Sequence, residues 1–79
     1  MMTEIRLPAL AHAVAGLSIL RWFKRTGDPV TLDEPLLEIN TDEGTHEIQA
    51  PVTGVLATIL LKDGAFVEAG AVLGTIRRF

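Results

Sequence analysis

The sequence of 79 residues contains no cysteine, which excludes disulfide bonds and thiolate metal sites. Its two histidines, His12 and His46, are too few for a histidine-rich metal site. A chain of this length buries only about 60% of its unfolded surface on folding, so it has little stability to spare. Because no covalent staple is available, stability must come from packing of the 48% hydrophobic residues. We expect a single domain spanning residues 1–79.

Aromatic residues and positive charge are also scarce. Ten acidic residues against seven basic ones give a net charge of −3, which argues against a basic face for nucleic acid. Apolar runs are too short to span a membrane, and Glu4 and Arg6 interrupt any N-terminal export signal. We therefore expect a soluble domain without nucleic-acid or membrane partners, located in the cytoplasm, or in the mitochondrial matrix of a eukaryote. The few aromatic residues are Trp22, Phe23, Phe66 and Phe79.

The remaining pattern is that of β-strands. Apolar positions alternate or form short blocks, and glycine or proline interrupts them every eight to twelve residues. All four prolines fall at the edges of these blocks, where a missing N–H does least damage. The pattern predicts an all-β domain with strands at residues 4–7, 17–24, 36–41, 45–50, 54–61 and 71–77.

The sequence contains a weak internal repeat with an offset of 37 residues. Two similar sheet halves packed face to face about an approximate twofold axis would explain it, because neither half could bury its own apolar face. This predicts a flattened barrel or sandwich. The matched positions are Gly27 and Gly64, Val30 and Val67, Leu36 and Leu73, Ile39 and Ile76, Ile19 and Leu56, and Trp22 and Ile59.

The link between the two halves predicts a β-hairpin with a tight turn. Asp42 and Glu43 suit the central positions of a type I turn, and Gly44 suits a following residue with positive φ. Together with Glu38 and Glu47, these residues make the hairpin strongly acidic. Turn chemistry alone explains such a hairpin as a solvated polar tip.

The order and spacing of many positions are more specific than any single motif. They include Leu7-Pro8, Trp22, Gly27-Asp28, Val30, Asp33-Glu34, Leu36, Glu38, Thr41-Asp42, Glu47-Ile48, Ala50-Pro51, Gly54, Gly64, Val67, Gly70, Leu73 and Ile76. Along residues 4–77 the chain thereby resembles the lipoyl domain of the dihydrolipoamide acyltransferase component of 2-oxo acid dehydrogenase complexes, a biotinyl/lipoyl-like family. The resemblance implies a flattened barrel of two four-stranded antiparallel sheets with quasi-twofold symmetry.

The resemblance also implies a carrier without an active site of its own. In the family, the residue after Thr-Asp is a lysine joined to lipoic acid, which forms a swinging arm. The implied partners are a 2-oxo acid decarboxylase, the acyltransferase core, dihydrolipoamide dehydrogenase and a lipoate ligase. The resemblance also implies a monomeric domain. The implied cofactor-binding positions are Glu43, which replaces the attachment lysine, with Thr41, Asp42 and Gly44 around it. Since a carboxylate cannot form the lipoyl amide, we expect the chain as given to be unmodified.

Two interpretations remain open. The chain is either a lipoyl carrier domain with a substituted attachment residue, or a non-catalytic module that docks a partner through the acidic hairpin and the loop Ala9–Ala15. In the family, that loop helps the cognate decarboxylase to recognise its domain, although a solvated loop histidine is the simpler account of His12. Biotin carriage fits less well, because biotinyl domains place their lysine between two methionines. Lys24 and Lys62 are not convincing substitutes, since neither follows a Thr-Asp pair.

No catalytic or metal site is predicted. Ser18 lacks the Gly-x-Ser-x-Gly context of a nucleophile, and no glycine-rich phosphate loop is present. We assign Trp22 to the core rather than to a ligand platform, His46 to a structural or surface role, and Gly54 to a bend or a close backbone approach. The other predicted core residues are Val30, Leu36, Ile39, Ile48, Leu56, Val67, Leu73 and Ile76.

Overall fold

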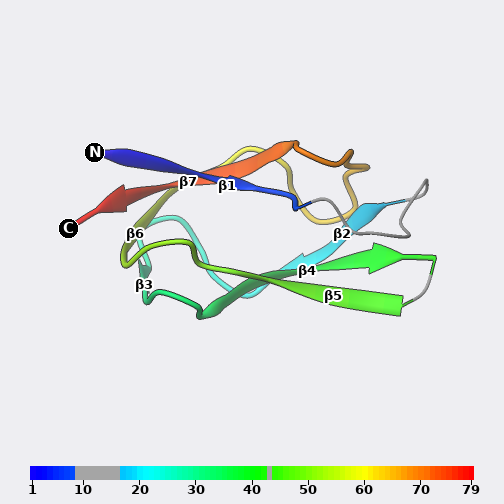
Figure 1. Ribbon diagram of the computed structural model, residues 1–79, viewed down its shortest axis with the longest axis horizontal. Helices are drawn as coiled ribbons and strands as arrows, with labels where there is room; N and C mark the ends of the chain where they lie inside the picture. The colour runs from blue at the N-terminus through cyan, green and yellow to red at the C-terminus, as the bar shows by residue number, and fades with distance from the viewer. Residues whose placement is uncertain (9–16, 43) are drawn as a thin grey trace.

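The computed structural model describes residues 1–8, 17–42 and 44–79, which form strands without a helix (Figure 1). No helix in these three segments could cross a membrane. The strands are β1 (Met2–Arg6), β2 (Ser18–Trp22), β3 (Pro29–Val30), β4 (Pro35–Thr41), β5 (Gly44–Gln49), β6 (Gly54–Ile59) and β7 (Val72–Arg78). Six of them match predicted strands. The seventh, β3, has only two residues, too few for an alternation to be recognised in the sequence.

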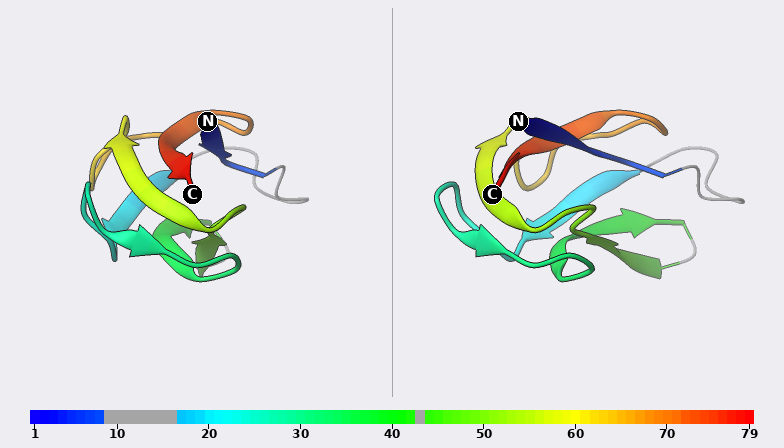
Figure 2. Two further views of the ribbon diagram at one scale, coloured as in Figure 1. Left: turned by 90° about the vertical axis from the view of Figure 1, so that its left-hand side faces the viewer. Right: turned by 60° about the vertical axis from the view of Figure 1, so that its left-hand side comes forward.

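The strands form two antiparallel sheets that enclose the core (Figures 1 and 2). One sheet has four strands in the order β1-β7-β6-β3, and the other has three in the order β2-β4-β5. A single bridge between Ser18 and Phe66 stands where the second sheet would have its fourth strand. The predicted two-sheet fold is therefore confirmed, with that fourth strand reduced to one bridge.

The twofold relation predicted from the repeat is present in the backbone hydrogen bonds. The Gly27 N–H donates to the Leu56 carbonyl at 2.8 Å, and the Gly64 N–H donates to the Ile19 carbonyl at 2.7 Å. The two bonds correspond, because Gly64 lies 37 residues after Gly27 and Ile19 lies 37 residues before Leu56. Three further pairs of bonds keep the same offset: Asp28 to Arg25 with Ala65 to Lys62, Glu34 to Thr31 with Ala71 to Glu68, and Phe23 to Leu36 with Leu60 to Leu73.

The turns of the two halves share their unusual backbone as well. Gly27 and Gly64 have φ of 92° and 87°, a region that glycine enters without steric cost. The next turn of each half has Asp33 at φ 70° and Gly70 at φ 84°. Among the described residues, Asp33 is the non-glycine residue with positive φ, and Gly70 is its repeat partner.

The core lies between the sheets and is wholly apolar among the described residues. All eight predicted core residues other than Trp22 are buried in it. The buried positions that the repeat did not identify include Ile5, Leu7, Leu17, Leu37 and Ala50. At about 25 cal/mol per Å² of buried apolar surface, this cluster is the main source of stability in a chain without covalent staples.

The fold places the β4–β5 hairpin and the chain termini at opposite ends of the molecule. Its longest dimension is 35 Å, and Figure 1 shows the hairpin tip at one end of this axis and both termini at the other. The Arg78 N–H donates to the Met1 carbonyl at 2.9 Å, so the two terminal strands close on each other. The hairpin thus projects from a barrel that is held together at its far end.

Candidate functional site

After a register shift between Pro35 and Leu37, the β4–β5 hairpin keeps one register from the Leu37–Ile48 pair to its tip. Asn40 pairs with Thr45, and Thr41 pairs with Gly44. Only residues 42 and 43 therefore lie between the last paired residues. A two-residue loop fixes the register of the strands that flank it, so the described residues Thr41, Asp42 and Gly44 mark the end of the hairpin.

The tip brings together three of the four predicted site residues. The Thr41 hydroxyl donates to the Gly44 carbonyl at 2.9 Å, which closes the base of the loop. Gly44 has φ of 123°, which confirms its predicted positive φ. Asp42 is exposed. Glu43, the predicted attachment position, lies outside the described residues.

The solvent face of the hairpin sheet carries a cross-strand row of charges. Glu38 lies opposite Glu47 in the β4–β5 register, an arrangement of like charges that destabilises a pair of strands. Arg21 on β2 lies opposite Glu38 and contacts its carboxylate at 3.2 Å. The Arg21 guanidinium also lies 5.3 Å from the centre of the Phe23 ring. The acidic hairpin therefore receives one cation from the neighbouring strand, which the hairpin sequence by itself could not reveal.

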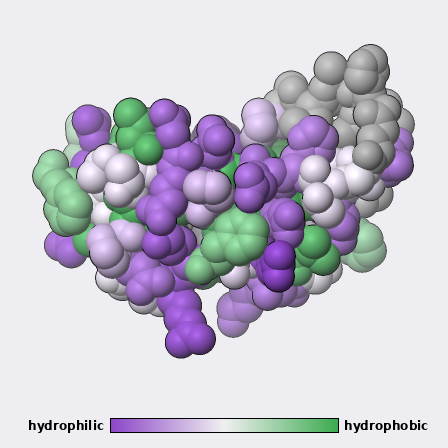
Figure 3. Space-filling view, turned by 90° about the horizontal axis from the view of Figure 1, so that it is seen from below, coloured by the Kyte–Doolittle hydropathy of each residue, from purple (hydrophilic) through white to green (hydrophobic). Residues whose placement is uncertain are grey.

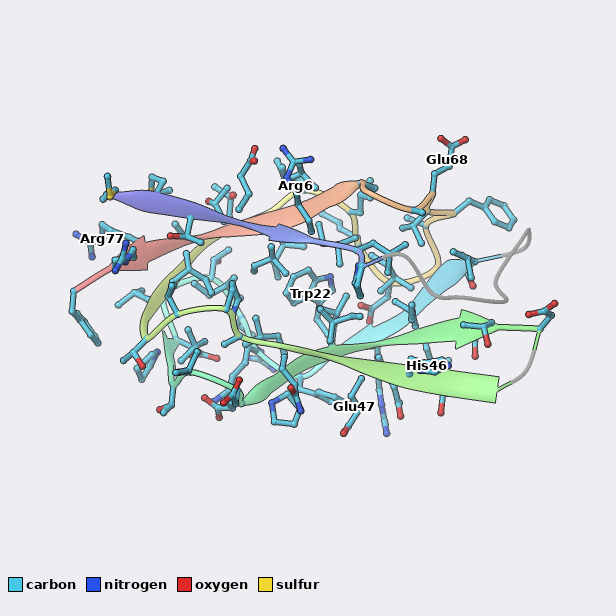
Figure 4. All side chains as sticks on the ribbon, viewed as in Figure 1. Arg6, Trp22, His46, Glu47, Glu68 and Arg77 are labelled. Atoms are coloured by element: carbon cyan, nitrogen blue, oxygen red, sulfur yellow. The ribbon has the colours of Figure 1, made fainter. Side chains whose placement is uncertain are left out.

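The other predicted surface positions divide into two groups. The loop Ala9–Ala15 and its His12 lie outside the described residues. His46 pairs with the buried Ile39 in the hairpin register, yet it is exposed, so it has the surface role that was one of its two expected assignments (Figure 4). Within residues 1–8, 17–42 and 44–79, no three acidic, histidine or cysteine side chains are close enough to hold a metal.

Both lysines lie away from the hairpin tip. Lys24 follows β2, and its amine contacts the Glu34 carboxylate at 2.8 Å. This hydrogen bond, helped by one from the Thr31 N–H, lowers the pKa of Glu34. Lys62 is exposed in the turn after β6. Neither lysine lies in the loop of the β4–β5 hairpin or follows a Thr-Asp pair.

Trp22 packs against the core and is held by two hydrogen bonds. Its indole Nε1–H donates to the Leu61 carbonyl at 2.8 Å, and its backbone N–H donates to the Asp63 carboxylate at 3.0 Å. It is partly buried rather than fully enclosed. The ring also approaches Gly74, where an added Cβ would lie 3.3 Å from Cη2 of the indole. These contacts support the predicted structural role over a ligand platform.

Two glycines allow close approaches between strands. A Cβ on Gly54 would collide with the Arg77 carbonyl oxygen, and one on Gly74 would collide with that of Thr58. The prediction for Gly54 is therefore confirmed. Gly74 was not predicted, although its repeat partner Leu37 is a large residue and the contrast in size was visible in the sequence.

Phe66 is the surface residue that the sequence interpretation missed. It is 83% exposed, and it bridges to Ser18 at the edge of the hairpin sheet. The available signal was the repeat, which matches Phe66 to Pro29. Because Pro29 is exposed at the start of β3, the repeat predicts that the aromatic ring of Phe66 is exposed too.

The tip does not supply the chemistry that lipoic acid requires. Attachment of a carboxylic acid as an amide needs a side-chain amine. The described tip offers a hydroxyl from Thr41, a carboxylate from Asp42 and no side chain from Gly44, and the sequence adds a second carboxylate at Glu43. The residues present therefore fit the shape of a carrier hairpin but do not fit the covalent group.

Comparisons with known proteins agree with the fold. The family described as biotin-requiring enzymes, which covers biotin and lipoyl domains, matches residues 3–76. A succinyltransferase component of the 2-oxoglutarate dehydrogenase complex from Bartonella vinsonii is 45% identical over 76 residues, 96% of this chain and 18% of that protein. An acetyltransferase component of the pyruvate dehydrogenase complex from Corynebacterium glutamicum is 40% identical over 74 residues, 94% of this chain and 11% of that protein.

A solved structure extends the match to three dimensions. The lipoyl domain of the 2-oxoglutarate dehydrogenase complex from Azotobacter vinelandii superposes with a TM-score of 0.76 and 31% identity, and 94% of each chain is covered. The chain thus spans a whole lipoyl domain but less than a fifth of the two acyltransferases. It belongs to the biotin/lipoyl domain family, close to the lipoyl domains of 2-oxo acid dehydrogenase acyltransferases.

Proposed function

We propose that this chain is the lipoyl-type module of a 2-oxo acid dehydrogenase complex whose attachment position is occupied by Glu43 and therefore carries no lipoyl group. The observation that supports this most is the intact hairpin around that position. The strand register is regular from the Leu37–Ile48 pair to the Thr41–Gly44 pair, and the Thr41 hydroxyl closes the loop. A hairpin that had lost its role altogether would have no need to keep this geometry.

The domain contributes position rather than reactivity. The hairpin, at one end of a molecule whose longest dimension is 35 Å, offers its loop to partner enzymes, while the terminal strands close the other end. In a complex, a domain that is tethered to its partner enzymes holds its hairpin loop at a high effective concentration near them. The partners under this proposal are a 2-oxo acid decarboxylase, the acyltransferase core, dihydrolipoamide dehydrogenase and a lipoate ligase.

A second function is favoured by Glu43 itself. A module that cannot form the lipoyl amide could still dock on the enzymes that recognise lipoyl domains. In this case the acidic hairpin would act as an interaction surface, and the domain would bind without carrying an acyl group. The two functions differ in whether Glu43 is the only obstacle to modification.

Intact mass spectrometry separates the two. We would express the Glu43→Lys variant and the parent chain with a lipoate ligase and lipoic acid. The carrier proposal predicts that the variant gains one lipoyl group and that the parent gains none. If the folded variant stays unmodified, the hairpin has lost ligase recognition more widely, and the docking function becomes the better account.

A further inference from the structure

Phe66 is held on the surface by the backbone on both sides of it. The Val67 N–H donates to the Leu17 carbonyl at 3.0 Å, and the Ala65 carbonyl accepts from the Ile19 N–H at 2.9 Å. Val67 is 8% exposed and faces the core. Since neighbouring residues of an extended segment point to opposite sides, Phe66 must face solvent, and its 83% exposure is fixed by the fold.

Phe66 is linked to the β4–β5 hairpin by a series of cross-strand pairs. Phe66 pairs with Ser18, Ser18 with Asn40, and Asn40 with Thr45. Residues paired in this way share one face of a sheet, so the phenyl ring lies on the same outer face as two hairpin side chains. At about 4.8 Å between strands, Phe66 is roughly 10 Å from Asn40, and Asn40 is two residues from Asp42 at the tip.

Among the described residues, the hairpin sheet and the adjoining segment 62–68 carry more acidic than basic side chains. Figure 3 shows the hairpin side as largely hydrophilic with separate hydrophobic patches, and Figure 4 places Glu68 at the hairpin end and Arg77 at the other. Arg21 is already engaged by Glu38. The described carboxylates of the hairpin sheet and the adjoining 62–68 segment are Glu38, Asp42, Glu47, Asp63 and Glu68, against the cations Arg21 and Lys62.

We propose that Phe66 anchors a docking surface, made with Ser18, Asn40 and Thr45, for the decarboxylase component that acts at the hairpin tip. The complementary surface is an apolar pocket for the phenyl ring, bordered by lysine and arginine. The hydrogen bonds of Ala65 and Val67 hold the backbone of Phe66 in place. An aromatic side chain has only two χ angles to fix on binding, so it supplies contact area at a low cost in conformational entropy. The inference rests on the proposed function, because the decarboxylase is a partner only if the hairpin is that of a lipoyl-type module.

The experiment uses a matched pair of phenylalanines. Phe66 and Phe79 are 83% and 85% exposed, but Phe79 lies at the terminal end. We would titrate the ¹⁵N-labelled parent, Phe66→Ser and Phe79→Ser chains with the 2-oxoglutarate decarboxylase component of Bartonella vinsonii. Because Phe66 is exposed, Phe66→Ser should stay folded, and its amide spectrum checks this. Phe66→Trp, which keeps an aromatic ring, is a second variant.

We expect Phe66→Ser to weaken binding by roughly tenfold or more, Phe79→Ser to bind as the parent does, and Phe66→Trp to retain binding. The parent's shift changes should centre on Phe66, Ser18, Asn40 and Thr45. Equal affinity of the two serine variants, shift changes centred on Arg77 and Arg78, or no binding by the parent would each overturn the inference.

A second readout distinguishes this inference from the proposed function. With 2-oxoglutarate as the donor, the decarboxylase should reductively acylate lipoylated Glu43→Lys. Loss of CO2 from the 2-oxo acid supplies the succinyl group and the two electrons that open the dithiolane to one thioester and one thiol, and Phe66→Ser should lower kcat/KM by a similar factor through KM. If the decarboxylase binds in a Phe66-dependent way but does not acylate the lipoylated variant, the carrier function fails and the docking surface stands. If acylation proceeds with an unchanged KM in Phe66→Ser, the docking surface is refuted and the carrier function stands.

Discussion

The two halves of the barrel share their turns but differ in the side chains that fill and cover them. Backbone hydrogen bonds repeat at an offset of 37 residues, down to Gly27 with Leu56 and Gly64 with Ile19. Yet one half places Trp22 beside Leu37, where the other pairs Ile59 with Gly74. Shared features are those that any such barrel needs. The differences therefore indicate which residues this chain uses for its own packing and its own surface.

The outer faces differ most in charge. Arg21 and Glu38 form an ion pair on the hairpin sheet, whereas their counterparts Thr58 and Thr75 form a hydrogen bond between hydroxyls at 2.7 Å. The same backbone thus supports an ion pair on the hairpin sheet and a pair of hydroxyls at the matching positions of the opposite sheet.

The largest expected effect comes from Trp22→Ala. The change removes a ring that packs on the core and a hydrogen bond to the Leu61 carbonyl, and we expect it to lower the free energy of unfolding by about 3 kcal/mol. The repeat partner gives the comparison, because Ile59→Ala removes a smaller side chain and should cost less. Urea denaturation measures both. A loss below about 1 kcal/mol for Trp22→Ala would show that the indole does not contribute to the core.

The next effect concerns Gly74, where the halves differ in size. A methyl group there would meet the Thr58 carbonyl and the Trp22 ring, so Gly74→Ala should lower stability by about 2 kcal/mol. Leu37→Ala at the matching position should instead leave a cavity in the core. Thermal unfolding with both variants tests the contrast, and a Gly74→Ala chain as stable as the parent would refute the close packing of β6 and β7.

A smaller effect is expected at the hairpin tip. Gly44 has φ of 123°, and a Cβ added to it would have no atom within 4 Å, so Gly44→Val should cost about 1 kcal/mol through its backbone alone. Amide shifts should change around Thr41 and Thr45 while those of β6 and β7 stay constant. Unchanged shifts at the tip would contradict the positive φ of Gly44.

The smallest effect is the pH dependence of the Lys24–Glu34 pair. Folding lowers the pKa of Glu34, so the stabilisation is present above the pKa of the unfolded chain and is lost as the pH falls through the folded value. The stability of the parent should therefore fall more than that of Glu34→Gln between about pH 5 and pH 3. The repeat partners Leu61 and Ala71 form no such pair. Parallel pH profiles of the two chains would contradict the assignment.

The sequence predicted what depends on local pattern and on the repeat. Alternation located six strands, and the matched glycines located two turns. The structure was needed for β3, which is too short to alternate, and for contacts between distant residues, such as Arg21 with Glu38 and Phe66 with Ser18. The tip was predictable because Asp42 and Gly44 have specific turn preferences. The fixed exposure of Phe66 was not, because it depends on hydrogen bonds on both sides of the ring.

The most direct test of the central claim is to locate the lipoyl group after ligase treatment of Glu43→Lys. That variant has three lysines, at positions 24, 43 and 62, and each lies at a turn or a strand end. Peptide mapping by mass spectrometry should find all of the added mass on residue 43, because this position follows Thr41-Asp42 whereas neither Lys24 nor Lys62 follows a Thr-Asp pair. Lipoylation of Lys24 or Lys62 instead would contradict the account.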